Sequence, residues 1–262
     1  MNGLHELGGP GMRIGGVVDM STVDWYGNVS LVVFFAGCNL RCPYCQNSGL
    51  IPLNSGEEVD LDYLRGRILL NMTPVPELDS VVLTGGEPTL QAEAVLEVAG
   101  LARELGLKVM LDTNGSLPEA IEPLLEAGLV DRVALDLKAP LNARDYEEAA
   151  GASNAEDVVA NVGRTLDLCA EYGVDVEART TVAPTVTDSE RFIRGIARDI
   201  RDRCAVYYLQ QYDNTGEVLS PRLKQLPPPT KERLKELAEV ALAEGLRNVY
   251  IKTREDGLER MG

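Results

Sequence analysis

The feature that most limits the fold is an alternation of short apolar runs with amphipathic segments along most of the 262 residues. Runs rich in Val and Leu predict six buried strands, at residues 29–35, 80–85, 108–113, 132–138, 174–182 and 205–211. The amphipathic stretches between and after them, several closed by a glycine suited to a helix C-cap, predict helices at 89–106, 116–128, 154–173, 188–202 and 229–245. This order of elements is typical of an α/β fold with a parallel sheet.

Six strand–helix units are too few to close an eight-unit barrel. We therefore predict a single α/β domain built as a partial, open (β/α)6-type barrel. We expect an N-terminal arm at residues 1–28, the barrel at 29–212, and at 213–262 a C-terminal flap, a helix and a short strand that pack on the barrel. Folds of this kind bind ligands at the carboxyl ends of their strands.

Composition and charge argue against several classes of partner. The formal net charge is −16, and a surface that acidic repels nucleic-acid phosphate and anionic membranes. The first thirty residues lack a basic start followed by an apolar block, and the longest apolar run, LVVFFAG, is far too short to span a bilayer. We expect a cytoplasmic protein with reduced thiols that binds neither nucleic acid nor membrane.

Three of the five cysteines, Cys38, Cys42 and Cys45, have the spacing CxxxCxxC directly after the first predicted strand. One interpretation is a chance crowding of buried thiols. A second is a structural zinc site, which needs a fourth ligand from the remaining candidates, His5, Cys169 and Cys204. A third is an iron–sulfur cluster, in which three thiolates leave one iron open to a small ligand.

The other two cysteines and the lone histidine receive no functional role from the sequence. Cys169 and Cys204 lie in a predicted helix and at a predicted strand start, where a single cysteine more often packs in the core. His5 lies in a glycine-rich N-terminal stretch and is the only histidine of the chain.

Polar residues follow three of the predicted strands, in LTGGEP, LDTNG and LDLKAP. Strand alternation places Asp136 and Lys138 on one face, where charges need a ligand or a partner. Structural interpretations remain open for each motif. GGEP suits a tight turn with Pro88 at the first helical position, DTNG suits an Asx-type turn, Asp136 and Lys138 suit an ion pair, and Arg179 in ARTTVAP suits a carboxylate partner.

These motifs together resemble the radical S-adenosylmethionine (SAM) superfamily, in which an aromatic residue, here Tyr44, precedes the third cysteine. The resemblance implies a [4Fe–4S] cluster on Cys38, Cys42 and Cys45, whose open iron chelates SAM. It also implies the family's reaction, in which an electron from the cluster splits the S–C5′ bond and yields a 5′-deoxyadenosyl radical. The protein then supplies binding, orientation and exclusion of water.

The resemblance also implies roles for residues at the strand ends. The carbonyls of Gly85 and Gly86 and the carboxylate of Glu87 would hold the methionyl ammonium group of SAM. LDTNG and LDLKAP are similar to motifs of glycyl-radical activating enzymes, in which the lysine, here Lys138, meets the SAM carboxylate.

Four further positions follow from the same narrower group. Asp136 would lie near the ribose and a bound monovalent cation, and Asp112 and Thr113 would lie near SAM and the same cation. Arg179 resembles a strand arginine of that group.

The stretches STVDWYGNVSLVVFFAGCNLRCPYCQN and YYLQQY are similar to anaerobic ribonucleoside-triphosphate reductase activating proteins. This implies a glycyl-radical reductase as partner and an electron donor such as flavodoxin or ferredoxin. One departure concerns the loop after the sixth strand, where pyruvate formate-lyase activases carry a histidine and this chain reads LQQYDN. The ribose contact there stays unassigned.

Two other functions remain open at this point. One is a radical SAM enzyme that acts on a small molecule, similar in size and barrel to the ring-contracting synthase of deazaguanine biosynthesis. The other is a zinc-stabilised α/β binding module. The segment NTGEVLSPRLKQLPPP suits a mobile flap whose Arg and Lys side chains face an acidic partner.

Overall fold

The computed structural model describes residues 11–75 and 77–262. Its residues form two compact units, and we describe each by itself. Unit 1 consists of the described residues of Met1–Cys38, with Leu50–Asp112 and Glu119–Asp131. Unit 2 consists of Asn39–Gly49, Thr113–Pro118 and Arg132–Gly262. His5 lies outside the described residues.

Unit 1 is built on a mixed sheet. Its strands lie in the spatial order β3 (Glu57–Val59), β1 (Met12–Ser21), β2 (Ser30–Phe35), β4 (Ser80–Gly85) and β5 (Lys108–Thr113). Strands β2, β4 and β5 are parallel, whereas β1 runs antiparallel to both β2 and β3. The helices are α1 (Leu61–Leu70), α2 (Ala92–Glu104) and α3 (Pro118–Glu126), with short 3-10 turns η1 (Ser48–Leu50) and η2 (Pro88–Gln91).

The parallel strands of unit 1 carry its core. Residues 31–33, 81–83 and 109–111 have no exposed surface. Both faces of these strands are therefore covered, which explains why their sequences are apolar nearly throughout. Helix α2 packs on β4, and its apolar positions Val95 and Val98 are fully buried.

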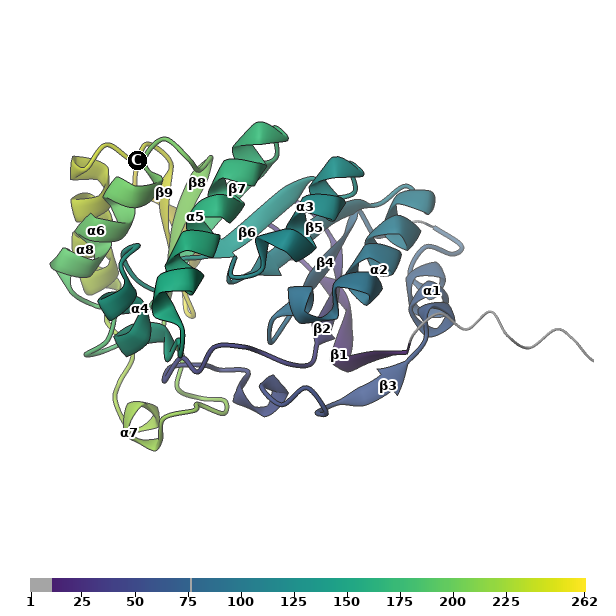
Figure 1. Ribbon diagram of the computed structural model, residues 1–262, viewed down its shortest axis with the longest axis horizontal. Helices are drawn as coiled ribbons and strands as arrows, with labels where there is room; N and C mark the ends of the chain where they lie inside the picture. The colour runs from purple at the N-terminus through teal and green to yellow at the C-terminus, as the bar shows by residue number, and fades with distance from the viewer. Residues whose placement is uncertain (1–10, 76) are drawn as a thin grey trace, which may run out of the picture. The chain divides into compact units, whose positions relative to one another are not determined.

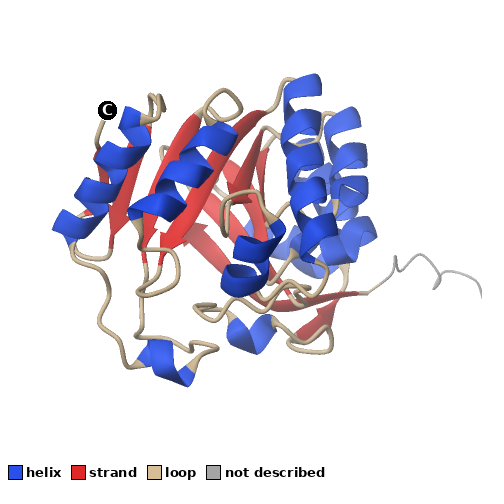
Figure 2. Ribbon diagram, turned by 60° about the vertical axis from the view of Figure 1, so that its left-hand side comes forward, coloured by secondary structure: helices blue, strands red, loops and turns tan. Residues whose placement is uncertain are grey.

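Unit 2 contains the second run of parallel strands. Their order is β6 (Arg132–Asp136), β7 (Asp175–Val182), β8 (Val206–Gln211) and β9 (Val249–Thr253), and the antiparallel strand β10 (Gly257–Arg260) forms the outer edge. The helices are α4 (Ala143–Ala150), α5 (Ala155–Glu171), α6 (Glu190–Ile200), α7 (Pro221–Lys224) and α8 (Lys231–Ala243). Figures 1 and 2 show α5, α6 and α8 on one face of strands β7 to β9.

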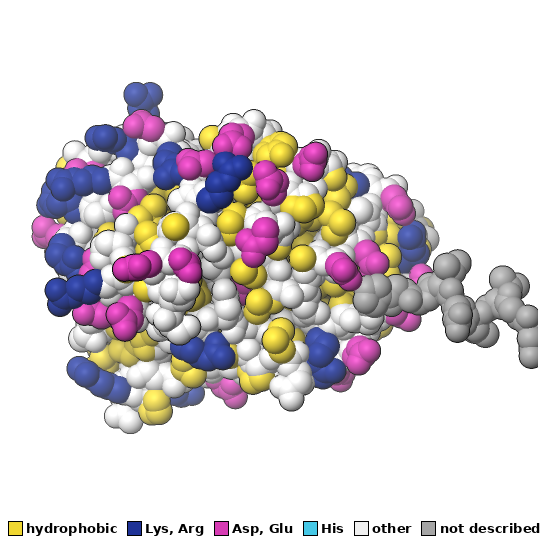
Figure 3. All heavy atoms as spheres, in the orientation of Figure 1, with side chains coloured by type: hydrophobic (Ala, Val, Ile, Leu, Met, Phe, Trp, Pro, Cys, Tyr) yellow, Lys and Arg dark blue, Asp and Glu magenta, His cyan; other side chains and the backbone are white. Residues whose placement is uncertain are grey.

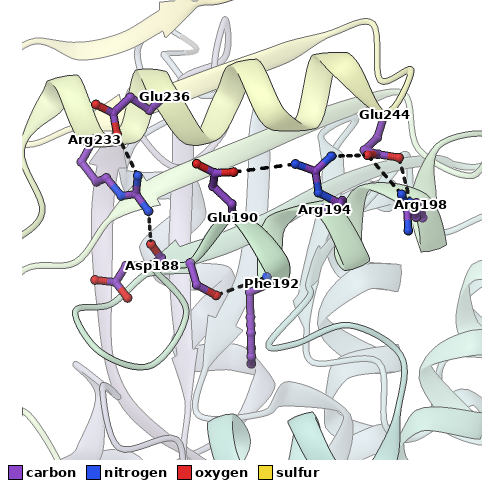
Figure 4. A network of polar contacts seen from close by, with 9 residues as sticks. Asp188, Glu190, Phe192, Arg194, Arg198, Arg233, Glu236 and Glu244 are labelled. Carbon is purple, nitrogen blue, oxygen red and sulfur yellow. Dashed lines mark hydrogen bonds and ion pairs between the residues drawn. The ribbon is translucent and has the colours of Figure 1, made fainter.

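Helices α6 and α8 are joined by an apolar contact and a rim of ion pairs. Ile193 and Ile196 of α6 and Leu234 and Leu237 of α8 are fully buried. At the rim, Glu244 accepts hydrogen bonds from Arg194 at 2.7 Å and from Arg198 at 2.8 Å (Figure 4). Exposed pairs of this kind contribute little each, so the buried leucines and isoleucines hold the two helices together.

The six predicted strands correspond to β2 and β4–β8, and the five predicted helices to α2, α3, α5, α6 and α8. Strand β9 corresponds to the short strand expected within residues 213–262, and the structure adds β1, β3, β10, α1, α4 and α7, which the periodicity did not indicate. Residues 12–21 were expected in an N-terminal arm and instead form β1, hydrogen-bonded to β2. Among the described residues, no helix is both long and apolar enough to cross a lipid bilayer.

Candidate functional site

The turn after β4 places glycine backbone directly against the end of β2 in unit 1. The backbone N–H of Gly86 donates to the Phe35 carbonyl at 2.9 Å, and that of Glu87 donates to the Gly37 carbonyl at 2.6 Å. A Cβ on Gly85, whose φ is +130°, would lie 2.2 Å from the Phe35 oxygen, and one on Gly86 would lie 2.1 Å from the Gly37 oxygen. Both glycines are therefore required for this backbone packing, whatever ligand they also approach.

Glu87 is fully buried in that turn. Its carboxylate accepts hydrogen bonds from the Thr89 N–H at 3.1 Å and the Thr89 hydroxyl at 2.5 Å, so it caps η2. Pro88 is the first residue of η2, which confirms the structural interpretation of GGEP as a strand-to-helix turn. The cap fixes the position of a buried carboxylate at the end of a parallel strand. That position suits the predicted ammonium contact, which stays a prediction.

The DTNG segment forms the Asx-type turn that its sequence favours. Within unit 2, Asn114 Oδ1 accepts the backbone N–H of Ser116 at 2.9 Å, and Thr113 Oγ1 accepts that of Gly115 at 3.0 Å. The turn also holds Asn39, whose side chain donates to the Ser116 hydroxyl at 2.7 Å and accepts from Asn114 at 2.9 Å. Asp112 lies in β5 and is the last residue of that strand that belongs to unit 1.

Asn39 and Ser116 are functional candidates that the sequence analysis missed. The network of Asn39, Asn114 and Ser116 anchors the start of residues 39–49, which we call the cysteine loop. A polar residue directly after Cys38, at the end of a buried strand, was the available signal for Asn39.

The cysteine loop is held on two sides within unit 2. On one side, the backbone N–H of Arg41 donates to the carbonyl of Ala150 at the end of α4, at 2.8 Å. On the other, the N–H of Leu219 donates to the Cys45 carbonyl at 3.2 Å, and that of Ser220 to the Pro43 carbonyl at 2.9 Å. Segments 109 and 174–177 residues away in the sequence therefore fix this loop.

In the described part of the chain, none of the five cysteines forms a disulfide bond. Cys42 is buried in unit 2, Cys45 is partly exposed in unit 2, and Cys38 is partly exposed in unit 1. Burial raises the pKa of the Cys45 thiol above its ordinary value. Over residues 11–75 and 77–262, no three His, Cys, Asp or Glu side chains are grouped as metal ligands.

Cys169 has the environment of a core thiol, whereas Cys204 is partly exposed. Burial raises the pKa of Cys169 to about 12 and that of Cys204 to about 11. Cys169 is fully buried in α5, where it packs as a small apolar side chain. His5, the remaining candidate for a fourth zinc ligand, lies outside the described residues.

Asp136 and Lys138 form the ion pair that was one interpretation of DLK, with 2.7 Å between Lys138 Nζ and Asp136 Oδ2. Burial acts to lower the pKa of Lys138, but the negative charge of Asp136 and further nearby groups raise it above its ordinary value. The ammonium group is therefore charged at neutral pH. A half-buried cation held by one carboxylate can attract a second anionic group, such as a substrate carboxylate.

Two buried tyrosines lie in the electrostatic environment of this pair in unit 2. The pKa of Tyr44 is raised well above its ordinary value, first by burial and then by the neighbouring Cys42. Tyr146 of α4, fully buried, has a pKa raised mainly by burial, and it also interacts with Lys138 and Cys42. Tyr146 was not predicted, because nothing in the periodicity indicated α4.

Arg179 of β7 lies in register with Asp136 of β6. Its guanidinium group binds Glu177 through Nε at 2.7 Å and Nη2 at 2.6 Å, and Arg132 Nη1 lies 3.3 Å from the second Glu177 oxygen. The carboxylate-partner interpretation of Arg179 is thus confirmed. Sequence reasoning missed Glu177, although its i, i+2 spacing from Arg179 puts both side chains on one strand face.

Comparisons with known proteins identify the family of the chain. Residues 32–194 match the model of the radical SAM superfamily. A protein of Methanocaldococcus jannaschii assigned as a glycyl-radical enzyme activating enzyme is 36% identical over 244 residues, which are 92% of this chain and 95% of that one. The pyruvate formate-lyase-activating enzyme of Clostridium pasteurianum is 31% identical over 72% of this chain and 76% of its own.

The fold agrees with the same family. The crystal structure of a radical SAM methyltransferase from Sphaerobacter thermophilus superposes with a TM-score of 0.70, covers 88% of this chain and 68% of its own, and is 18% identical. At that identity the likeness shows the fold alone, and it confirms the predicted α/β fold of the partial-barrel kind. The family model covers more than half of the chain, and the chain therefore belongs to the radical SAM superfamily.

Proposed function

We propose that this chain is a glycyl-radical enzyme activating enzyme whose partner is the anaerobic ribonucleoside-triphosphate reductase. The observation that carries the activating role is the 36% identity that extends over 92% of this chain and 95% of the M. jannaschii protein. The reductase as partner rests on the resemblance of the segments around the cysteine motif and of YYLQQY.

The types of residue in these motifs suit the cofactors that the superfamily uses. Cys38, Cys42 and Cys45 offer three reduced thiols within eight residues, the ligands that an iron–sulfur cluster prefers, and leave one iron for SAM. When bound, the cluster and SAM together supply one-electron chemistry at carbon. The hydrogen bonds that fix the cysteine loop on α4 and on residues 219–220 set the positions of Cys42 and Cys45.

The other side chains bind and orient SAM in this proposal. Lys138, kept charged by Asp136, receives the SAM carboxylate, and Glu87, fixed by its cap, receives the ammonium group. Gly85 and Gly86 present carbonyls beside it, and Arg179, aligned by Glu177, adds a second cation.

Oxygen atoms of Asp112, Thr113 and Asp136 are suitable ligands for a monovalent cation, the additional ion of the proposal. Tyr44 and Tyr146 keep water from the buried side of Lys138 in unit 2, and this strengthens each charge–charge contact there.

An anaerobic electron paramagnetic resonance experiment tests the proposal. The iron-reconstituted, reduced chain is mixed with SAM and the anaerobic reductase of the same organism. We expect a persistent glycyl-radical doublet that is lost when Cys38, Cys42 or Cys45 is replaced by Ala. Cys169→Ser and Cys204→Ser are matched controls that keep the iron and the doublet.

Two other outcomes would each refute one part of the proposed function. A cluster signal that changes on addition of SAM, without a doublet, would remove the reductase as partner and favour a small-molecule substrate. A preparation that binds zinc and no iron would remove the activating role.

A further inference from the structure

The segment 213–226, which we call the strap, lies along the cysteine loop in unit 2. Besides the hydrogen bonds of Leu219 and Ser220, the Gln46 side chain donates to the Asp213 carbonyl at 2.8 Å. Glu217 Oε2 would lie 3.1 Å from a Cβ added to Gly49, at the far end of the loop. The strap therefore follows the cysteine loop from Pro43 to Gly49.

The strap has a structure of its own, and it is more than the flap that its sequence suggested. Val218 and Leu223 are buried, Ser220 caps α7, and Asn214 donates to the Leu226 carbonyl at 2.9 Å. Asp213 accepts both the N–H and the hydroxyl of Thr215 at 2.8 Å. These contacts fix which side chains the strap presents to solvent.

Arg222 and Lys224 on the strap differ from most arginines and lysines of this acidic chain. Acidic residues outnumber basic ones 41 to 25, and most arginines are in ion pairs, as Arg194 and Arg198 are with Glu244. Arg222 and Lys224 are exposed and, in the described part of the chain, form no ion pair. Lys224 instead donates to the Gly216 carbonyl at 2.7 Å.

Their neighbours complete a surface with an apolar centre. Leu219, three residues before Arg222, is 38% exposed. The strap itself carries two carboxylates, that of Glu217 and that of Asp213, which accepts a hydrogen bond from Thr215. Figure 3 shows Lys and Arg side chains at the lower left, where Figure 1 places α7.

We propose that Leu219, Arg222 and Lys224 form the docking surface for a small acidic electron-transfer protein that reduces the cluster. This inference rests on the proposed function, because it needs a cluster on the cysteine loop. Leu219 is bonded to the Cys45 backbone, and three residues of chain span at most about 11 Å, so Arg222 is held close to that cysteine.

Charge explains why the partner is acidic and why it docks at this place. A net charge of −16 repels an acidic protein from most of the surface, whereas a local group of cations attracts it. A small apolar centre within a charged rim is typical of a brief, specific encounter. The electron therefore reaches the protein beside Cys45, a ligand of the proposed cluster.

The step itself balances with one electron. The anionic flavin hydroquinone of a flavodoxin gives up one electron and becomes the neutral semiquinone, and the oxidised cluster gains that electron. No bond is broken, and no proton moves.

The test compares Arg222→Glu with Arg247→Glu in the iron-reconstituted full chain. Arg247 is a matched control, because it belongs to the same unit, is exposed and, within residues 77–262, forms no ion pair. It precedes β9 at the amino end of that strand, whereas the strap follows the carboxyl end of β8. Each variant is reduced anaerobically, once by hydroquinone flavodoxin and once by dithionite, and the cluster absorbance is followed by stopped flow.

We expect Arg222→Glu to slow reduction by flavodoxin about tenfold or more at low salt, and a double Arg222→Glu, Lys224→Glu variant to slow it further. The difference from the native chain should shrink as salt rises. The Arg247→Glu variant should be reduced at the native rate by both flavodoxin and dithionite. The Arg222→Glu variant should be reduced at the native rate by dithionite alone.

Three results would overturn the proposal, and they are distinguishable. Native-rate reduction of Arg222→Glu by flavodoxin at low salt would show that the strap is not the docking surface. Normal reduction combined with loss of radical transfer to the reductase would assign the surface to that enzyme. A native chain without a reducible cluster, even with dithionite, would refute the proposed function and this inference with it.

Discussion

The energetic role of the buried ion pair between Glu177 and Arg179 can be tested without any cofactor. Its side chain is 4% exposed and that of Arg179 is 10% exposed, so both charges lie out of water. Replacing Glu177 by Ala removes two hydrogen bonds to Arg179 and one to Arg132, and takes away the buried carboxylate that the Arg179 guanidinium binds. Removing one partner of a buried ion pair costs about 3–5 kcal/mol.

The matched variant replaces both partners, as Glu177→Met with Arg179→Met. With no charge left unpaired, its free energy of unfolding should lie within about 1–2 kcal/mol of the native chain. We would measure urea unfolding of the iron-free chain by circular dichroism, since the single tryptophan, Trp25, lies in unit 1 and reports poorly on unit 2. A cost below about 1 kcal/mol for Glu177→Ala, or a double variant as unstable as the single one, would refute this reasoning.

Two further predictions concern backbone packing and acid stability. Gly86→Ala should cost about 2–3 kcal/mol in the free energy of unfolding, because the new Cβ meets the Gly37 oxygen at 2.1 Å. Gly100→Ala on α2, with nothing within 4 Å, should instead stabilise by about 0.5–1 kcal/mol, and a like effect of both changes would contradict the close-packing argument. Asp145 accepts two hydrogen bonds from Arg191, at 2.9 and 2.8 Å, and these lower its pKa. Its contribution is therefore present above the unfolded pKa of about 4 and is lost as pH falls through the lower folded pKa. Asp145→Asn should be about 1 kcal/mol less stable at pH 7 and approach the native chain below pH ~4, and a difference independent of pH would count against this assignment.

Much of the fold was accessible from the sequence because the parallel strands are buried on both faces. Residues such as those at 31–33 and 81–83 are apolar for that reason, and runs of this kind are easy to recognise. Strand β1 was missed because MRIGGVVDMS mixes polar residues with two glycines and has one exposed side. Its strand character comes from hydrogen bonds to β2, and the local sequence does not specify those.

The sequence could predict the part of the site that one short motif carries, as the cysteine motif does. It could not predict the contacts that support this motif, because they join segments that are distant in the sequence. Asn39 is hydrogen-bonded to Ser116, and the Cys45 carbonyl is hydrogen-bonded to Leu219 of the strap. No spacing in the sequence indicates either pair. Lys138 could be selected from DLK, but its charge state follows from burial and from Asp136, which only the structure shows together.

The outer edge of the unit 2 sheet has a consequence for how this protein behaves at high concentration. Strand β10 has only four residues and ends in Glu259 and Arg260. Glu259 is bound by both Lys231 and Lys235 at 2.7 Å, so charged side chains stand beside the open backbone groups. A short, charged edge resists pairing with strands of other molecules. At this edge the chain therefore resists strand pairing between molecules when it is concentrated for reconstitution.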